Sequence, residues 1–149
     1  MNRRMRLGTV LLLIMVPLAG CSLTTDYTTT VGEPTNGTVI ENASAEFVDD
    51  WAGVQYEIEY NSSYRDHTAS YGDNSSYSFE VYEHVNGSLE FVDRSGFNNI
   101  EPATPPVYQG SVSPPWDSGE ERVYEIRVVN ETTEAVVDAV TVTIENNSS

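Results

Sequence analysis

Alternating apolar and polar positions run through most of the chain after residue 38 and predict short β-strands. The segment VQYEIEY alternates in this way, and its apolar face consists of Val54, Tyr56, Ile58 and Tyr60. Successive side chains of a strand point to opposite faces, so this pattern is typical of a half-buried strand. The same pattern predicts strands within 39–48 and over 77–85, 88–94, 122–130 and 135–145. Their inward residues are expected to be Tyr77, Phe79 and Val81, then Tyr124, Ile126 and Val128, then Val136, Val140, Val142 and Ile144.

Turn signals connect these segments into hairpins. Asn86-Gly87 favours a tight turn because both residues tolerate positive φ, and residues 130–134 form a second polar turn. Segment 95–119 carries five prolines, which forbid a long central strand, so 107–112 is predicted as a short edge strand. Trp116 is expected to pack over one end of the core. Seven short strands with no amphipathic helix predict an all-β fold, a single antiparallel β-sandwich.

The last predicted hairpin resembles the final two strands of immunoglobulin-like modules, including types found on archaeal surface proteins. Asp117-Ser118-Gly119, ahead of Tyr124, is similar to the turn that leads into the corner tyrosine of such modules. The resemblance covers the end of the chain and implies a fold. It implies no activity, because unrelated functions share this architecture.

The N-terminus has the three parts of an export signal: three arginines at positions 3, 4 and 6, an apolar run, and Leu18, Ala19, Gly20 and Cys21. These last four residues resemble the lipobox of prokaryotic lipoproteins. The resemblance implies cleavage before Cys21 and attachment of a glycerolipid to its sulfur. An uncleaved anchor over the uncharged residues 7–25 is the alternative, although Pro17 and Gly20 make a poor spanning helix. The arginines also partly match a twin-arginine signal, so the export route stays open.

These features predict four parts. Residues 1–20 are a lipoprotein signal peptide, and residues 21–38 are the lipidated Cys21 with a threonine-rich tether. Residues 39–146 are the β-sandwich domain, and residues 147–149 are a C-terminal tail.

The net charge of the chain indicates the kind of environment it is adapted to and which binding partners are expected. The chain has 23 acids and 7 arginines, no lysine, and a formal charge of −16. Residues 21–149 hold four of the arginines and every acid, which gives them a charge of −19. This composition resembles that of secreted proteins from extremely halophilic archaea, whose acidic surfaces are screened by molar salt. A role in recruiting cations or a basic partner is the alternative interpretation. Nucleic acid is not an expected partner, because no basic patch exists.

Candidate chemistry is sparse. His67 and His84 are the only histidines, and with Cys21 lipidated they supply too few ligands for a transition-metal site. Asp66, Asp73 and Asn74, or Asp49 and Asp50, lack the regular spacing of a calcium loop. Arg65-Asp66-His67 lies near serines, but no nucleophile elbow or phosphate loop accompanies it. We therefore expect no metal, no cofactor and no enzymatic activity.

The last kind of candidate functional residue is a site of covalent modification. Asn-x-Ser/Thr triplets, the acceptors for N-glycans in exported chains, begin at Asn36, Asn42, Asn61, Asn74, Asn130, Asn146 and Asn147. Asn86 also begins one, but it serves the predicted turn. The inward tyrosines are expected in the core, with a platform for stacking carbohydrate as the alternative.

The sequence therefore predicts a lipoprotein anchored to the cell membrane through Cys21 and facing the exterior. We expect a monomeric, non-enzymatic surface module of a halophilic archaeon that contacts an envelope protein, a glycan or a solute. The alternative is an accessory lipoprotein that captures a solute or cation for a transporter.

Overall fold

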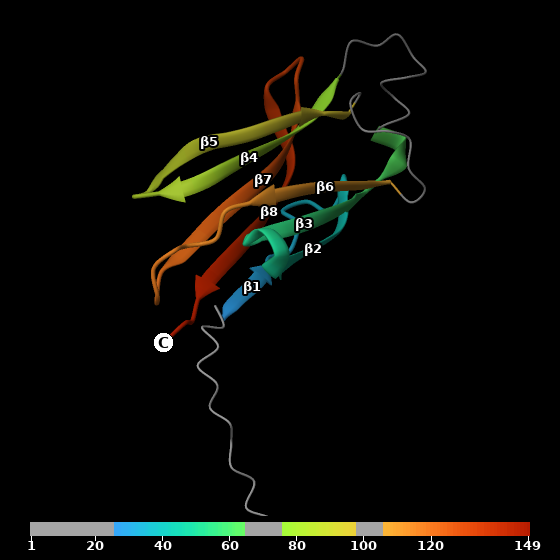
Figure 1. Cartoon of the computed structure of the whole chain (residues 1–149). Coiled ribbons are helices and arrows are strands. Elements are labelled where there is room, and N and C mark those ends of the chain that lie inside the picture. The colour runs from blue at the N-terminus through green and yellow to red at the C-terminus, as the bar shows by residue number, and fades with distance from the viewer. Residues whose placement is uncertain (1–25, 65–75, 98–105) are drawn as a thin grey trace, which may run out of the picture.

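Two antiparallel β-sheets face each other in the computed structural model, which describes residues 26–64, 76–97 and 106–149 (Figure 1). One sheet has five strands in the order β1-β8-β7-β4-β5, and the other has three in the order β2-β3-β6. The strands are β1 (Tyr27–Val31), β2 (Ile40–Val48), β3 (Gly53–Tyr60), β4 (Tyr77–Val85), β5 (Ser88–Gly96), β6 (Val107–Val112), β7 (Glu121–Asn130) and β8 (Ala135–Asn146). A 3-10 turn, η1 (Asp49–Trp51), joins β2 to β3.

This arrangement confirms the predicted all-β sandwich, and its strand order is immunoglobulin-like. Without β1, the first, second and fifth strands form one sheet, and the third, fourth, sixth and seventh form the other. Each of the seven predicted strands is present, and β6 lies at an edge as expected.

The core lies between the sheets and is rich in aromatic rings. Tyr60, Phe79, Phe97 and Tyr108 form a continuous cluster in which the Phe79 and Tyr108 rings stack with centroids 4.4 Å apart. Such pairs add about 0.5–1.5 kcal/mol to the free energy gained from burial alone. Tyr56, Tyr60 and Tyr124 are buried and Tyr77 packs half-buried against the core, so these inward tyrosines are core or rim residues, as predicted. Burial raises the pKa of Tyr56, which therefore stays neutral.

Two local signals in the sequence have the predicted conformation. Asn86 and Gly87 have φ values of 51° and 81°, the left-handed geometry that a tight hairpin turn requires. The Tyr124 hydroxyl donates a 2.7 Å hydrogen bond to the carbonyl oxygen of Ser113, which fixes the connection from β6 to β7. This bond is the counterpart of the corner tyrosine in immunoglobulin-like sandwiches.

The predicted boundary between tether and sandwich is wrong. Residues 27–31 lie within the predicted tether but form β1, which pairs with β8 from Tyr27↔Asn146 to Val31↔Val142. Tyr27 also stacks on Phe47 with centroids 4.3 Å apart. The folded domain thus begins at Tyr27 rather than at residue 39, because threonine packs well in a strand when a partner edge is available.

Residues 35–40 are fixed to β8 by the buried Asp138. One carboxylate oxygen of Asp138 accepts from the backbone N–H groups of Val39 and Ile40, each at 3.0 Å. The other accepts from Asn36 at 3.0 Å and from Ala139 at 3.0 Å. This carboxylate holds the chain where it crosses from one sheet to the other.

The predicted inward position of Val136 is also wrong, since Val136 is 47% exposed. The register between β7 and β8 changes at this point: Val128 pairs with Asp138, but Val129 pairs with Val136. The extra residue of this β-bulge reverses the alternation, so Val137 packs against the core and Val136 faces outward.

Several predictions fall outside the described residues, among them Leu18, Ala19, Gly20 and Cys21, the Arg65-Asp66-His67 segment, and Asp73 and Asn74. Within the described ranges, none of the helices has the length and apolar character needed to cross a bilayer.

Candidate functional site

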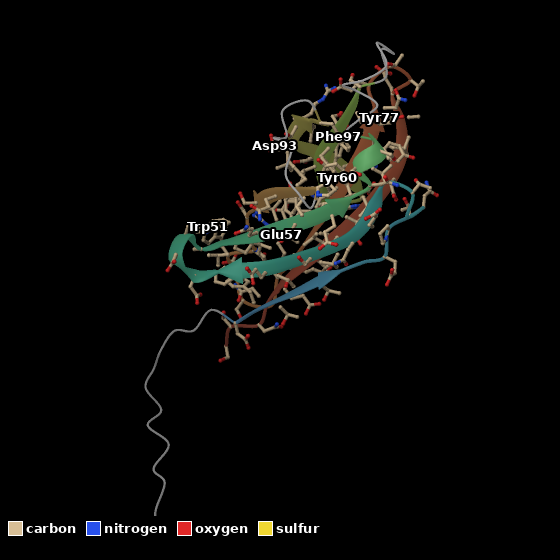
Figure 2. The ribbon with its side chains drawn as sticks, turned by 90° about the vertical axis from the view of Figure 1, so that its right-hand side faces the viewer. Trp51, Glu57, Tyr60, Tyr77, Asp93 and Phe97 are labelled. Carbon is tan, nitrogen blue, oxygen red and sulfur yellow. The ribbon has the colours of Figure 1, made fainter. Side chains whose placement is uncertain are left out.

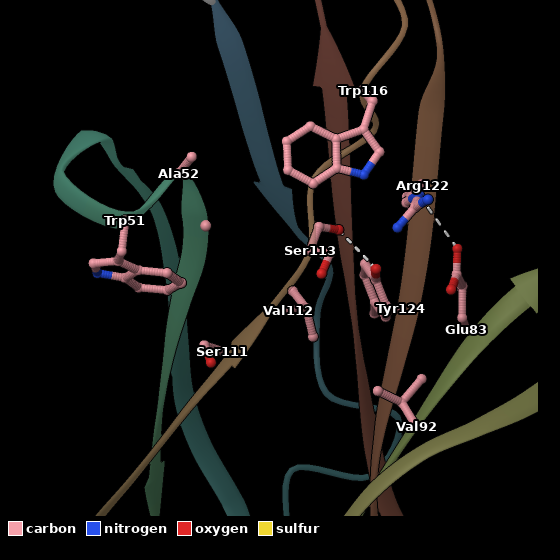
Figure 3. Close-up of a pocket in the computed structure, with 11 residues that line it drawn as sticks. Trp51, Ala52, Glu83, Val92, Ser111, Val112, Ser113, Trp116, Arg122 and Tyr124 are labelled. Atoms are coloured by element: carbon pink, nitrogen blue, oxygen red, sulfur yellow. Dashed lines mark hydrogen bonds and ion pairs between the residues drawn. The ribbon is translucent and has the colours of Figure 1, made fainter.

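A groove of about 440 Å³ opens at one end of the sandwich, where both sheets contribute to its walls (Figure 3). Volumes of this size are typical of small-molecule sites. The groove is lined by Trp51, Ala52, Gly53, Glu83, Val92, Ser111, Val112, Ser113, Trp116, Arg122 and Tyr124. Both tryptophans of the chain belong to this lining, although they come from separate segments.

Trp51 forms one wall and is held there by the local backbone. It ends η1, and its indole lies against Gly53, where an added Cβ would come 1.7 Å from Cζ3 of the ring. Only glycine leaves room for the ring at that position. Trp51 is nevertheless 49% exposed, so much of the indole faces solvent.

Trp116 forms the opposite side of the groove (Figure 3), and hydrogen bonds anchor its backbone. The buried side-chain amide of Asn146 donates to the carbonyl oxygens of Pro115 and Trp116, at 3.3 and 3.2 Å. Tyr27 donates to Pro115 at 3.0 Å. The Trp116 side chain is 67% exposed, so the prediction that it packs over the end of the core is wrong.

The floor of the groove is polar. Arg122 and Glu83 form an ion pair of 3.5 Å between Nε and Oε1. A hydrogen bond with the Tyr124 hydroxyl raises the pKa of Arg122, and the nearby charges of Glu83 and Glu120 act in the same direction. Burial raises the pKa of Tyr124, so that hydroxyl stays protonated and keeps its bond to Ser113. The floor thus presents one fixed cation beside one carboxylate.

This arrangement suits binding. Two exposed indole faces can stack on a ligand, the guanidinium offers donors, and the carboxylate offers acceptors. Ser111 and Ser113 add polar groups from the end of β6. None of the groove residues is a histidine or cysteine.

A second depression of about 420 Å³ lies on the outer face of the five-stranded sheet. Most of its charged groups form ion pairs with neighbouring side chains. Arg94 pairs with Glu131 at 2.6 Å, and Arg127 pairs with Glu125 at 2.6 Å while lying over the ring of Tyr82. His84 extends this network through a 3.2 Å contact with Glu125. We interpret this face as an ion-pair network on the sheet surface rather than a ligand site.

Most candidate glycosylation residues in the described ranges lie at the surface. Asn36 and Asn147 are exposed but donate through their side-chain amides, to Val137 O and Thr28 Oγ1 respectively. Asn42 is exposed on β2, and Asn86 is exposed in its turn. Asn61 and Asn130 are half-buried, and the side-chain oxygen of each accepts a hydrogen bond from a backbone N–H two residues later.

Asn146 is the exception among the candidate acceptors. It is 2% exposed, and its amide nitrogen, the atom that would carry the sugar, donates to Pro115 and Trp116. A glycan would replace one of the two hydrogens on that nitrogen, so at least one of these bonds would break, and the buried position leaves no space for a sugar. Asn146 is therefore a structural residue, and its prediction as an acceptor is incompatible with the fold.

Metal-binding groups do not converge in the part of the chain that the structure describes. No three side chains of histidine, cysteine, aspartate or glutamate come together there as a candidate metal site. Asp49 and Asp50 remain adjacent acids in the first turn of η1.

Sequence reasoning missed the groove as a site, although a signal was present. Both tryptophans stand in turn-rich contexts, DDWAG and PPWDSG, where each is next to an acid and no alternating pattern places it in a core. Large aromatic residues in such contexts favour exposure, and exposed tryptophans are enriched at interaction sites. What the sequence cannot supply is their convergence, since it depends on packing β3 and β6 against β7.

Comparisons with known proteins place the chain in no family. No protein-family model and no curated protein matches it. Among solved structures, it is similar to the crystal structure of chicken MD-1 complexed with lipid IVa, with 10% sequence identity, a TM-score of 0.34, and 85% of each chain covered. A similarity this distant carries no information on ligand or activity.

Proposed function

We propose that the chain is a membrane-anchored, non-enzymatic binding module displayed on the cell exterior, with the groove between Trp51 and Trp116 as its contact site. The observation that supports a binding role is the placement of both tryptophans: Trp51 is 49% exposed, Trp116 is 67% exposed, and both line one groove with a polar floor. A purely structural tryptophan is ordinarily buried on most of its surface.

The anchor in this proposal is a lipid on Cys21, as the resemblance to the lipobox implies. Two long chains hold a protein stably, since each buried methylene contributes about 0.8 kcal/mol. The first described residue, Asp26, lies close to Cys21 in sequence. A fully extended chain advances at most about 3.6 Å per residue, so Tyr27 stays within roughly 22 Å of Cys21.

The groove lies at this anchored end. Tyr27 contacts Phe47 and Pro115, which precede Trp51 and Trp116 by only a few residues. Figure 2 shows Trp51 at the end of the sandwich where β1 begins, whereas Tyr77 and Phe97 lie at the opposite end. The proposed contact site is therefore close to the exterior surface of the cell membrane.

Two measurements test the proposal. Cys21→Ser is expected to leave a larger, unlipidated precursor, and normal maturation of this variant would contradict the anchor. Vesicles that carry the mature protein are expected to bind washed envelope fragments of the host, and the Trp51→Ala/Trp116→Ala variant is expected to lose that binding. Equal binding by both proteins would contradict the groove as the contact site.

Capture of a solute or a cation for a transporter is the competing function, and Ca²⁺ is its simplest probe. It predicts a higher unfolding temperature when Ca²⁺ is added in molar NaCl, because a ligand that binds only the folded state stabilises it.

A further inference from the structure

We infer that the ligand of the groove is an uncharged glycan. Its sugar rings stack on Trp51 and Trp116, and its hydroxyls form hydrogen bonds with Arg122 and Glu83. This inference rests on the proposed binding role of the groove and names the ligand class.

The two indoles supply the first argument. Among the large apolar side chains that are exposed in the described residues, Trp116 ranks first at 67%, Phe91 second at 59% and Trp51 third at 49%. The two tryptophans stand on opposite sides of the groove, and about half of the Trp51 surface and two thirds of the Trp116 surface face solvent (Figure 3). A pyranose ring has one face made of C–H groups, and that face packs on an indole in the same manner as another apolar ring.

The polar floor supplies the second argument. The rim of a sugar ring carries hydroxyls, each of which both donates and accepts a hydrogen bond. Arg122 only donates and Glu83 only accepts, and the two lie 3.5 Å apart. Neighbouring hydroxyls of one sugar can therefore engage both groups at once. An entirely apolar ligand would instead strip water from this ion pair without replacing its hydrogen bonds, which is unfavourable.

Charge excludes the acidic classes of ligand. Arg122 is the only cation in the lining, and Glu83 already neutralises it. Asp49 and Asp50 precede Trp51, and Asp117 follows Trp116, so the surroundings of the groove are acidic. A phosphate, a uronate or an anionic lipid headgroup would meet repulsion there. The same acids disfavour a flat membrane contact through the two tryptophans.

An uncharged glycan near the membrane has two sources: the headgroup of a glycolipid, or a free or protein-linked polysaccharide. Both present the same rings and hydroxyls to the groove. The experiment separates them.

The test uses the mature full chain in molar NaCl and a polyoxyethylene detergent, because detergents with sugar headgroups would compete. The probes are maltotetraose, cellotetraose and a mannose tetramer, followed by tryptophan emission and calorimetry up to about 10 mM, the range of weak single-site binding. Tetragalacturonate serves as the charged counterpart. Phosphatidylcholine vesicles with and without digalactosyldiacylglycerol test the lipid-borne source.

We expect saturable binding of at least one neutral tetramer or of the glycolipid vesicles, with tetragalacturonate at least about tenfold weaker. Trp51→Ala and Trp116→Ala should each weaken binding about five- to tenfold. Phe91→Ala is the matched control: Phe91 is exposed on β5 but lies outside the groove lining, so its removal should leave binding unchanged. Far-UV circular dichroism checks that each variant remains folded.

Three results would overturn the inference: no binding of any neutral probe, equal binding of tetragalacturonate, or an equal response to phosphatidylcholine alone, which would assign the groove to a lipid surface. Failure here is distinguishable from failure of the binding role itself. If envelope binding still depends on the two tryptophans while every sugar fails, the ligand class is wrong and the binding role stands.

Discussion

Replacing Asp138 with asparagine should cost the fold a large part of its stability. Asp138 is 0% exposed, and its Oδ2 accepts from the N–H groups of Val39 and Ile40, each at 3.0 Å. Asparagine has one carbonyl oxygen, so its NH₂ group must occupy one of the two oxygen positions. If it takes the Oδ2 position, two buried N–H donors face another donor.

The size of this destabilisation follows from the number of buried N–H donors that lose their acceptor. A buried donor left without an acceptor costs about 1–3 kcal/mol, so the loss of the acceptor for two donors in Asp138→Asn should lower the free energy of unfolding by about 2–6 kcal/mol. A domain of this size has a total of about 5–15 kcal/mol, so the variant should remain folded but with a clearly lower urea midpoint. Urea unfolding in constant molar NaCl, followed by circular dichroism, measures the difference.

A matched control removes the same charge from the surface. Glu145 is exposed on the same strand, so Glu145→Gln eliminates a carboxylate without opening a buried hydrogen bond. Its urea midpoint should stay within about 0.5 kcal/mol of the wild type. A loss below about 1 kcal/mol for Asp138→Asn, or equal losses for both variants, would refute the account of the buried carboxylate.

The same residue gives stability a defined dependence on pH. Burial raises the pKa of Asp138, but hydrogen bonds from Ile40, Asn36, Val39 and Ala139 lower it more, so the pKa falls below its ordinary value of 3.8. A lowered folded-state pKa means that the stabilisation is complete above pH 3.8 and is lost as the pH falls through the folded value. The wild-type advantage over Asp138→Asn should therefore be constant from neutral pH to about pH 5 and shrink below pH 4.

Three further predictions concern other parts of the domain. Tyr124→Phe should lower the free energy of unfolding by about 1–2 kcal/mol, because the Ser113 carbonyl loses its donor; an unchanged urea midpoint would contradict this. Gly53→Ala should push the Trp51 ring into water, so in a Trp116→Phe background its emission should shift to longer wavelength while circular dichroism stays unchanged. Dilution from molar to 0.1 M NaCl should lower the urea midpoint, because the Debye length grows from about 3 to 10 Å and the −19 charge repels itself; a midpoint independent of salt would argue against an adaptation to brine.

Local pattern was sufficient for most of the fold. The seven predicted strands depend on period-two alternation and on turn residues such as Asn86-Gly87, and both are properties of adjacent residues. The strand β1 escaped prediction because its sequence, YTTTV, has little apolar contrast. Its burial still alternates, but only because β8 provides a pairing edge more than a hundred residues later. Pairing of that kind is not visible in a local window.

The bulge in β8 and the buried acid show the same limit. Val136 and Asp138 stand two residues apart, so simple alternation places both on one face. The bulge between them reverses that relation, and the carboxylate then becomes an acceptor for backbone at residues 36–40. The sequence did contain a signal for this buried carboxylate, because Asp138 occupies an inward position of the predicted strand and buried acids are rare unless they are paired.

The placement of β1 explains why the groove lies where it does. At the edge where β1 meets β2, Tyr27 stacks on Phe47, and the Thr29 hydroxyl donates to Ala45 O at 2.8 Å, so side chains close the sandwich there. The groove instead takes its lining from β3 and β6 on one sheet and from β4, β5 and β7 on the other, away from that closed edge. One strand thus closes one edge of the sandwich and starts at the end that carries both tryptophans.

If Cys21 carries the lipid, the groove stays within a few tens of ångströms of the membrane. A ligand of this module must then reach the membrane surface, and lengthening the chain between Cys21 and Tyr27 should change access to the ligand without changing its affinity for the groove.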